Sequence, residues 1–404
     1  MKIVVLKFGG TSVGTIDRIK KVSNIILEYH KKKYKVIVVS SAMSGVTNEL
    51  INKSKRISRN FSSQEHDVLV SSGEQMACAL IAGRLNDLGY KSSSFMGWQL
   101  PIITDGDYKI SRIRFIDKKV ITKYLNSGGI PIVTGYQGIN LNNRITTLGR
   151  GGSDASAIMI AKFFKAEKCV IYTDVEGVYS TDPNTYKNAK KIKIISYEEM
   201  LEMASLGAKV MQPISIQDGR LNRVDIDVKS SFKNKNGTLI TKKKNINSRR
   251  TITGITSTKN DSKVTLVGVK DRPGVAAEIF RPLSKNQINV DMVVQNISAS
   301  SNTTDLTFTI KTNDLKKTAK LLKENTKIKF RKLLIDKNVS KISIIGVGMI
   351  TTPGVTYRMF QALAKKNINI LVISTSEIKI SVIISKNNIK KALSTLHKEF
   401  ISNK

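Results

Sequence analysis

The amino-acid sequence predicts an α/β protein in which a mainly parallel sheet sandwiched by helices is followed by two small, related α/β modules. The first observation is a series of apolar strand patterns up to residue 232, each followed by a polar or glycine loop and a helical pattern. Such alternation is typical of a parallel sheet with helices on both faces. The second is a polar, basic stretch at 234–250, which predicts a linker. The third is an internal repeat beyond that stretch.

The opening stretch, residues 1–17, predicts a buried strand, a glycine turn and the start of a helix. An apolar run ends at Lys7 and is followed by a turn of small residues, Gly9, Gly10, Thr11 and Ser12. Glycines let backbone N–H groups approach an anion, and a lysine adds a point charge for phosphate. A phosphate-binding turn and glycines kept for packing alone are about equally supported here. The pattern matches neither the Walker loop nor the dinucleotide fingerprint.

The length and composition of the chain limit the classes of protein to which it can belong. A chain of 404 residues predicts two or three domains. It carries 67 basic and 31 acidic residues, a formal net charge of +36, but the lysines are spread along the chain without interleaved aromatics. This distribution favours a solvated surface over a nucleic-acid site. No secretory signal or membrane-spanning run is recognisable, and Cys78 and Cys169 are far apart, so we expect a cytoplasmic protein without nucleic-acid, membrane or metal sites.

Further polar loops follow the next strand patterns. A helix is expected over 18–31 and a strand over 35–39, which runs into a small-residue loop at 40–48. Ligands in open α/β sheets collect at the carboxyl ends of strands, so this loop and the glycine turn predict a shared site. Glu74 is expected to start the next helix, where its carboxylate would favour the helix dipole or receive an ammonium group.

A second glycine-rich loop precedes the helix expected over 155–164. In the run from Thr146 to Asp154, Arg150 and Asp154 flank a Gly-Gly pair, and Ser153 is the expected helix cap. A cap explains the serine alone, whereas the arginine and the doubled glycine favour an anion site.

The remaining part of the first domain contains turns and two strands. Strands are expected over 168–173 and 224–232, and a helix over 198–206. Tight turns at 174–183 would suit either a surface excursion or a wall for a flat base formed with Tyr179.

The internal repeat has an offset of 80 residues. The segment from Val267 to Val275, with its Pro-Gly turn, is echoed by the segment from Gly346 to Val355. Each copy predicts a strand, a turn, a helix, two strands and a helix. A period this long indicates paired small domains and excludes a solenoid.

Taken together, these loops resemble the aspartokinase branch of the amino acid kinase family, which carries two C-terminal ACT modules of ferredoxin-like βαββαβ fold. The resemblance covers nearly the whole chain and is most specific in the runs 7–12, 147–154, 173–183 and 374–381. It implies a catalytic domain at 1–245 and ACT modules at 246–336 and 337–404. It also implies ATP-dependent phosphorylation of the side-chain carboxylate of L-aspartate, with Mg²⁺ arriving on ATP.

The resemblance assigns roles residue by residue. It implies that Lys7, Asp154 and Lys209 act in catalysis. Substrate contacts are implied for Ser41, Thr47, Glu74, Arg150 and Ser153, with Arg150 on the α-carboxylate and Glu74 on the α-ammonium. Nucleotide contacts are implied for Lys7, Gly9, Gly10, Ser12, Thr173, Asp174, Tyr179, Asp182 and Lys209. Tyr108, Ser111 and Ile214 depart from the usual family pattern, which puts local contacts in doubt but not the reaction.

The ACT resemblance further implies a homo-oligomer and an amino-acid effector, lysine, threonine or both. The effector loops would contain Asp271, Gly274, Val275, Ala276, Gln295 and Asn296. Two alternatives remain at this point: a kinase for another acceptor, such as glutamate or acetylglutamate, and an amino-acid sensor with an inactive kinase domain.

Overall fold

The computed structural model describes residues 2–208, 210–242, 250–297 and 303–402. The chain divides into two compact units, which are described separately. The first comprises residues 1–178, 191–204 and 209–246, and the second comprises 179–190, 205–208 and 247–404. The main division therefore falls at the linker expected from the sequence, and two short segments of the expected catalytic domain belong to the second unit.

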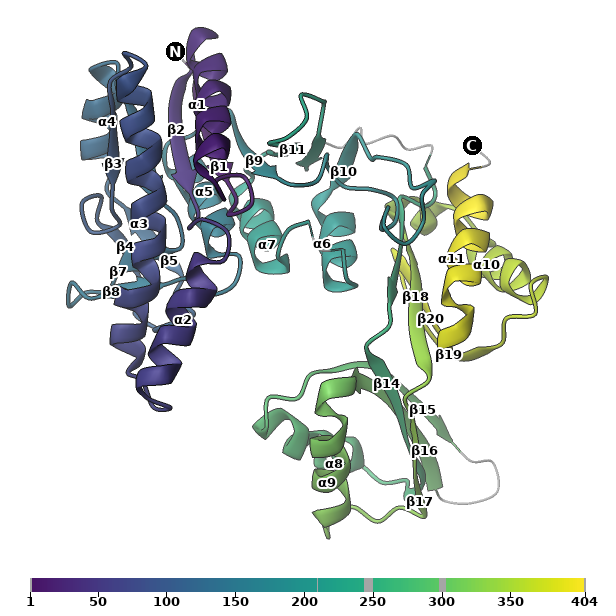
Figure 1. The fold of residues 1–404 in the computed structure, drawn as a ribbon. Coiled ribbons are helices and arrows are strands. Elements are labelled where there is room, and N and C mark those ends of the chain that lie inside the picture. Colours follow the sequence, from purple (N-terminus) through teal and green to yellow (C-terminus); the bar gives the residue numbers. More distant parts are fainter. Residues whose placement is uncertain (1, 209, 243–249, 298–302, 403–404) are drawn as a thin grey trace. The chain divides into compact units, whose positions relative to one another are not determined.

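The first unit is built on an eight-stranded sheet (Figure 1). Its strands, in spatial order, are β10 (Ile194–Ser196), β12 (Thr238–Thr241), β11 (Ile226–Ser230), β9 (Lys168–Thr173), β1 (Ile3–Phe8), β2 (Lys35–Ser40), β6 (Ile130–Thr134) and β3 (Ser92–Phe95). All neighbouring pairs are parallel except β11 and β12. The expected mainly parallel sheet is thus confirmed.

Helices cover both faces of this sheet. They are α1 (Ile16–Lys31), α2 (Val46–Ile57), α3 (Ser63–Asp87), α4 (Lys119–Asn126), α5 (Gly152–Phe163), α6 (Tyr197–Ser205) and α7 (Pro213–Asn222). One core joins α1 and α3 to the sheet through residues such as Ile26, Ile81 and Leu6, while α5 packs on β1 and β9. A small second sheet lies against α3 and α5. Its strands, in spatial order, are β5 (Ile113–Ile116), β4 (Ile102–Thr104), β7 (Gln137–Ile139) and β8 (Ile145–Thr147).

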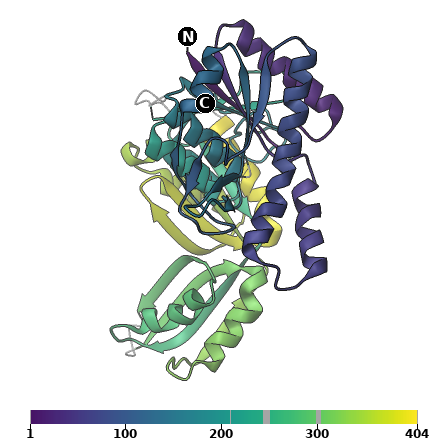
Figure 2. The ribbon, with the colours of Figure 1, turned by 90° about the vertical axis from the view of Figure 1, so that its left-hand side faces the viewer.

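Helix α3 corrects one expectation. It begins at Ser63, so Glu74 lies in its middle instead of at its start. The first turns of α3 bury polar residues such as Asp67 and Ser71, which hid the helical period of apolar residues. Helix α2 runs beside α3 (Figures 1 and 2), and Gly73 permits this approach, because a Cβ there would lie 3.2 Å from the Val46 side chain at the start of α2.

The start of α5 corrects a second expectation. Gly151 is the N-cap, with φ of +81°, and Ser153 is the second residue of the helix and makes no capping hydrogen bond. A left-handed backbone favours glycine, so the doubled glycine and not the serine sets the helix start.

The second unit contains two sheets of four strands. One has the order β15 (Val290–Ile297), β16 (Thr303–Lys311), β14 (Asp261–Lys270) and β17 (Lys332–Asp336); the other has β19 (Ile370–Ser376), β20 (Lys379–Ser385), β18 (Val339–Ile345) and β13 (Gly254–Thr258). Their helices are α8 (Val275–Lys285), α9 (Leu315–Glu324), α10 (Val355–Ala364) and α11 (Ile389–His397). The repeat is confirmed: Gly274 and Gly354 cap equivalent helices with φ of +88° and +83°.

The two modules differ from a simple tandem βαββαβ repeat in one strand. The fourth strand of the second sheet is β13, which precedes the whole first module in sequence and pairs antiparallel with β18. Residues 398–402, after α11, form a further helical turn. The offset of 80 holds as far as the starts of β15 and β19, but α9 and α11 begin only 74 residues apart. The two strands and their connection take up residues 290–311 in the first module and only 370–385 in the second.

Candidate active site

The alternation of side chains along strand β1 determines which face of the sheet carries Lys7. Val4, Leu6 and Phe8 belong to the core shared with α1 and α3. Successive side chains of a strand alternate between faces, so Lys7 lies on the face covered by α5. Asp154 is in the first turn of that helix.

Lys7 and Asp154 form a buried ion pair. The distance from Lys7 Nζ to Asp154 Oδ1 is 2.5 Å, and the side chains are 10% and 12% exposed. The lysine amine also lies over the glycine turn, because a Cβ built at Gly9 would be 3.5 Å from Nζ. The expected catalytic pair is therefore assembled at the end of β1.

The glycine turn offers free backbone donors. Gly9 N donates to the Tyr172 carbonyl at 3.1 Å, and the Gly9 carbonyl accepts from Ser12 N at 2.8 Å. Within the described residues, the N–H groups of Gly10 and Thr11 donate no hydrogen bond. Gly10 must lack a side chain, since a Cβ there would lie 2.9 Å from the Ala42 carbonyl. Unpaired N–H groups beside a lysine amine suit an anion such as phosphate.

Ser12 belongs to the wall of this turn. Its side chain is buried, and its hydroxyl lies 3.4 Å from the Tyr172 carbonyl, to which it donates, and 2.8 Å from Ser231 Oγ. These contacts tie the turn to the ends of β9 and β11.

Glu74, on α3, contacts the loop at 40–48, which lies beside the glycine turn. One carboxylate oxygen accepts from Ala42 N at 3.1 Å, and Ala42 is the residue whose carbonyl approaches Gly10. The other oxygen, Oε2, is buried without a partner in the described part of the chain. Burial raises the pKa of Glu74 to about 7. An unpaired buried carboxylate oxygen costs free energy unless a ligand fills the position, and an ammonium group is the fitting ligand.

The loop at 40–48 and the start of α5 meet at this edge around Gly135. Ser41 N donates to the Phe8 carbonyl at 3.1 Å, and the preceding Ser40 carbonyl accepts from Gly135 N at 2.9 Å. A Cβ at Gly135 would meet Ser153 Oγ at 3.0 Å. Gly135 thus lets the start of α5 approach the 40s loop. Thr47 is half-buried in the first turn of α2.

Arg150 lies between two left-handed glycines, Gly149 and Gly151. It is exposed, and within the described residues it has no hydrogen-bond or ion-pair partner. Gly151 packs against Gln212, which a Cβ would approach to 2.6 Å. The loop backbone is therefore fixed while the guanidinium remains available to a ligand.

The residues expected to contact the nucleotide belong to two different units. Thr173 Oγ1 donates to Asp174 Oδ1 at 3.0 Å at the end of β9, in the same unit as Lys7. Tyr179 and Asp182 belong to the second unit, and the Asp182 carboxylate accepts from Asn184 N and Thr185 Oγ1 within its own turn. Lys209 lies outside the described residues.

Asp67 is a residue that sequence reasoning missed. It is fully buried in α3, and its carboxylate accepts from Thr147 N at 2.8 Å, Thr147 Oγ1 at 2.9 Å and Lys109 N at 2.9 Å. Thr147 is three residues before Arg150, so Asp67 anchors the base of that loop. A lone aspartate in a polar stretch gave no signal of this role.

The three residues that depart from the family pattern have the following surroundings. Tyr108 OH accepts from Asn140 Nδ2 at 3.2 Å, and buried Ser111 donates through Oγ to the Asp107 carbonyl at 2.5 Å. Ile214 is half-buried near the start of α7.

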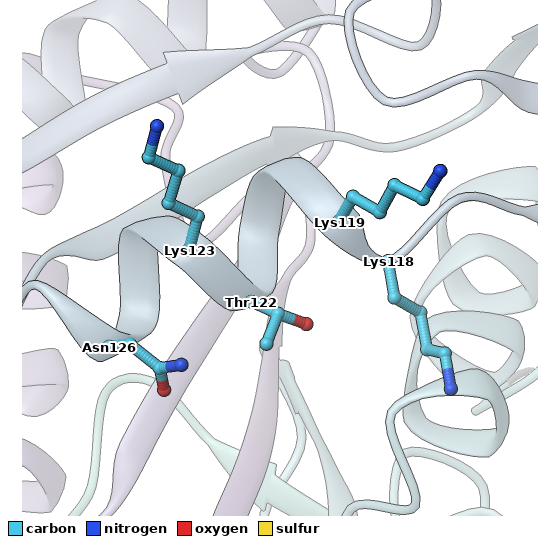
Figure 3. A pocket seen from close by; sticks show the side chains of 5 residues that line it. All are labelled: Lys118, Lys119, Thr122, Lys123 and Asn126. Atoms are coloured by element: carbon cyan, nitrogen blue, oxygen red, sulfur yellow. The ribbon is translucent and has the colours of Figure 1, made fainter.

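A separate hollow of about 490 Å³ lies at α4 and contains none of the predicted site residues. It is lined by Lys118, Lys119, Thr122, Lys123 and Asn126. In Figure 3 the three lysine side chains point in different directions, so they do not converge on one ligand.

The expected effector residues lie in the first ACT-like sheet and its turn. Asp271 and Gly274 are in the connection between β14 and α8, Val275 and Ala276 begin α8, and Gln295 and Asn296 are exposed in β15. The described residues contain no helix with the length and apolarity that a membrane span requires.

Comparisons with known proteins agree with this architecture. The sequence model described as the amino acid kinase family matches residues 2–220, and an ACT domain model matches 264–325 and 342–400. The aspartokinase of Pseudomonas aeruginosa is 44% identical over 403 residues, covering 99% of this chain and 98% of the relative.

Solved structures extend the likeness. A crystal structure of E. coli aspartokinase III in complex with aspartate and ADP has a TM-score of 0.78 and 25% identity, covering 98% of this chain and 99% of that one. The same enzyme in complex with lysine and aspartate has a TM-score of 0.81 and 25% identity, covering 99% of this chain and 100% of that one. The chain belongs to the aspartokinase branch of the amino acid kinase family.

Proposed function

We propose that this chain transfers the γ-phosphoryl group of ATP to the side-chain carboxylate of L-aspartate, giving 4-phospho-L-aspartate and ADP. This is the first step of lysine, threonine, methionine and diaminopimelate biosynthesis, and we place it in the cytoplasm. The observation that carries the proposal is the Lys7 amine, held by Asp154 over a turn with unpaired N–H groups, together with the buried, unpaired oxygen of Glu74, whose other oxygen accepts from the neighbouring Ala42 N–H.

The reaction requires positioning more than proton transfer. One aspartate carboxylate oxygen forms a bond to the γ-phosphorus, while the bond from that phosphorus to the bridging oxygen breaks and leaves its electron pair on ADP. The attacking carboxylate is ionised at neutral pH, so no general base is needed. What remains is to bring two anions together and to stabilise the charge in the transition state.

Each residue has a defined task in this proposal. Lys7 contacts the transferring phosphoryl group, assisted by Lys209 from the nucleotide side, and Asp154 orients the Lys7 amine. Gly9 and Gly10 form the phosphate turn, whose wall is fixed by Ser12. Thr173 and Asp174, in the same unit as Lys7, contact the nucleotide. Tyr179 and Asp182 are proposed as further nucleotide contacts by the family resemblance.

The acceptor is held by opposite charges. Arg150 binds the α-carboxylate with its planar fork, and Glu74 binds the α-ammonium. Ser41, Thr47 and Ser153 provide polar contacts around the substrate.

Mg²⁺ enters as the partner of the ATP phosphates and supplies charge neutralisation there. The described residues contain no group of three or more His, Cys, Asp or Glu able to hold an ion. Mg²⁺ that arrives on ATP takes most of its ligands from phosphate oxygens and water.

A hydroxylamine assay tests the function directly. Purified protein is incubated with ATP, Mg²⁺ and L-aspartate, and the acyl phosphate is trapped as a hydroxamate. We expect product with aspartate and none with glutamate or acetylglutamate. Product only with another acceptor would move the chain to a different kinase activity, and no product with any acceptor would favour the sensor alternative.

We also propose regulation by lysine, threonine or both through the effector residues Asp271, Gly274, Val275, Ala276, Gln295 and Asn296. The ACT match and the lysine-bound relative support this idea. Each amino acid is titrated into the steady-state assay, alone and together. Unchanged rates at millimolar concentrations would contradict the proposal.

The ACT-like sheets also support a homo-oligomer. Their strands carry partly exposed apolar side chains, Val293, Leu334, Ile335, Leu371 and Ile373. Exposed apolar strand surface is a liability that a partner sheet would cover. Light scattering should therefore give a mass of at least two chains, and a monomer at assay concentration would exclude this arrangement.

A further inference from the structure

The end of β11 forms one wall of the glycine turn, although 219 positions separate Ser12 from Ser231. The Ser231 hydroxyl lies 2.8 Å from Ser12 Oγ and 3.2 Å from the Thr173 carbonyl. Ser231 N donates to the same carbonyl at 3.0 Å. These contacts fix one side of the turn to the sheet.

The next residue of this strand end, Phe232, supports Arg18. The guanidinium carbon of Arg18 lies 4.1 Å from the centroid of the Phe232 ring. From that position Arg18 Nη1 donates to the Thr11 carbonyl at 2.5 Å. A planar guanidinium can stack on a ring face and donate in its own plane at the same time. Phe232 therefore holds Arg18 against the turn.

The position of Arg18 has no explanation in helix stability. It is the third residue of α1, where a positive charge opposes the helix dipole. The helix has a separate cap, because Thr15 Oγ1 accepts from the Arg18 backbone N–H at 3.3 Å. Phe232 is 42% exposed, so its ring is not kept for the core. The contact of Arg18 with the Thr11 carbonyl, and that of Phe232 with Arg18, explain why these two side chains are present.

A phosphate turn must direct N–H groups at the anion and keep carbonyl oxygens away from it. Gly10 and Thr11 have the N–H groups without partners among the described residues, and the carbonyl of Thr11 is the one held by Arg18. We infer that Arg18, supported by Phe232, is a positioning residue for the ATP phosphates: it holds the Thr11 carbonyl and so keeps the adjacent N–H groups available. The inference rests on the proposed function in taking ATP as the anion.

The experiment compares nucleotide binding with aspartate kinetics in Arg18→Met and Phe232→Leu. ATP affinity is measured by titration calorimetry without aspartate, and KM for aspartate at saturating ATP. Arg18→Met should weaken ATP binding about tenfold, the loss expected for one charge-assisted hydrogen bond. Phe232→Leu should weaken it about two- to fivefold, the loss expected for the stacking contact that holds Arg18. KM for aspartate should stay within about twofold. The double variant should bind ATP no more weakly than Arg18→Met, because both changes remove the same contact.

The control is Lys21→Met, which removes an exposed charge from the same helix and should leave both constants unchanged. Unchanged ATP affinity in Arg18→Met and Phe232→Leu, or equal losses for ATP and aspartate, would overturn the inference. If Arg18→Met fails to fold, Phe232→Leu decides alone. If the wild type binds ATP but phosphorylates no aspartate, the proposed function fails, while the inference is still judged by the ATP affinities.

Discussion

The Lys7 amine lies 2.5 Å from the Asp154 carboxylate, with both side chains about nine-tenths buried. Buried ion pairs add little net stability, because desolvation offsets the attraction. The value of this pair therefore lies in fixing an amine at the end of β1, over the glycine turn. A charge positioned before the reaction stabilises a transition state without reorganisation.

Replacing Lys7 by Met should lower kcat by about 100- to 1,000-fold, as for other preorganised electrostatic groups. It should also lower the free energy of unfolding by about 3 kcal/mol, because the Asp154 carboxylate stays buried without its partner. Steady-state kinetics and urea unfolding measure the two effects separately.

The control for this variant is Lys2→Met. Lys2 pairs with Glu167 at 3.0 Å, but its side chain is 75% exposed. Surface pairs contribute at most about 1 kcal/mol, so kcat should not change. A Lys7→Met enzyme with near-normal kcat would remove Lys7 from the mechanism.

Glu74 predicts how aspartate binding depends on pH. Burial raises the pKa of this carboxyl to about 7, and only its ionised form pairs with an ammonium group. KM for aspartate should therefore rise as pH falls below 7, and KM for ATP should not follow. In Glu74→Gln, KM for aspartate should be about 10- to 100-fold higher, from the loss of a charged hydrogen bond, and its pH dependence near 7 should disappear. The same pH dependence in the variant would assign the titration to another group.

Glu74 also predicts that stability and aspartate binding change in opposite directions with pH. Between pH 4.5, the ordinary pKa, and about 7, the folded protein keeps a proton that the unfolded chain has lost. The free energy of unfolding therefore decreases as pH rises through this interval, by about 3 kcal/mol in total. Glu74→Gln lacks this loss, so its stability relative to wild type should increase from pH 4 to pH 8. Urea unfolding at both values checks the sign.

The sequence was most informative where chemistry and backbone geometry coincide. The first turn requires glycine at Gly10 for close approach, and Gly151 requires it for a positive φ, so these loops could be predicted from residue types. The helix around Glu74 could not, because its buried face carries polar residues that serve the site and break the apolar period.

The pairing of strands that are far apart in the chain could not be predicted from local residue patterns. Nothing in the residues of β13, Gly-Ile-Thr-Ser-Thr, indicates that it pairs with β18 across an intervening module. Ser231 and Phe232 were also missed. Their role depends on the parallel pairing of β11 with β9, which brings the end of β11 beside the glycine turn.

Asp67 predicts a link between the core of α3 and the Arg150 loop. In Asp67→Asn, one acceptor oxygen becomes an NH₂ group facing backbone donors. We expect a loss of about 2 kcal/mol in the free energy of unfolding, and a higher KM for aspartate, because the loop that carries Arg150 loses its anchor. The control is Asp87→Asn in the last turn of the same helix, whose exposed carboxylate pairs only with Arg84 among the described residues. An Asp67→Asn enzyme with unchanged KM would confine the residue to a structural role.

His397 predicts acid sensitivity in the second unit. It is fully buried in α11, with Nε2 2.9 Å from Ser180 Oγ and its ring 4.7 Å from that of Tyr186. Burial lowers the pKa of His397 below 6.5, and the charge of Lys190 lowers it further. The unfolded chain therefore binds the proton first, so stability is fully present above pH 6.5 and is lost as pH falls toward the lower folded pKa.

The variant His397→Phe tests this sensitivity, because it keeps an aromatic ring against Tyr186 but cannot be protonated. At pH 7.5 it should be less stable than wild type by about 1–3 kcal/mol, from the lost hydrogen bonds of the imidazole to Ser180 and Ser402. Below pH 6.5 the wild type should lose stability more steeply than the variant. Thermal unfolding between pH 5.5 and 7.5 measures both slopes, with His30→Phe, half-buried in α1 of the other unit, as the matched control. Equal slopes for wild type and His397→Phe would show that the acid sensitivity of the second unit arises from other groups, and that the Ser180 contact does not depend on a neutral imidazole.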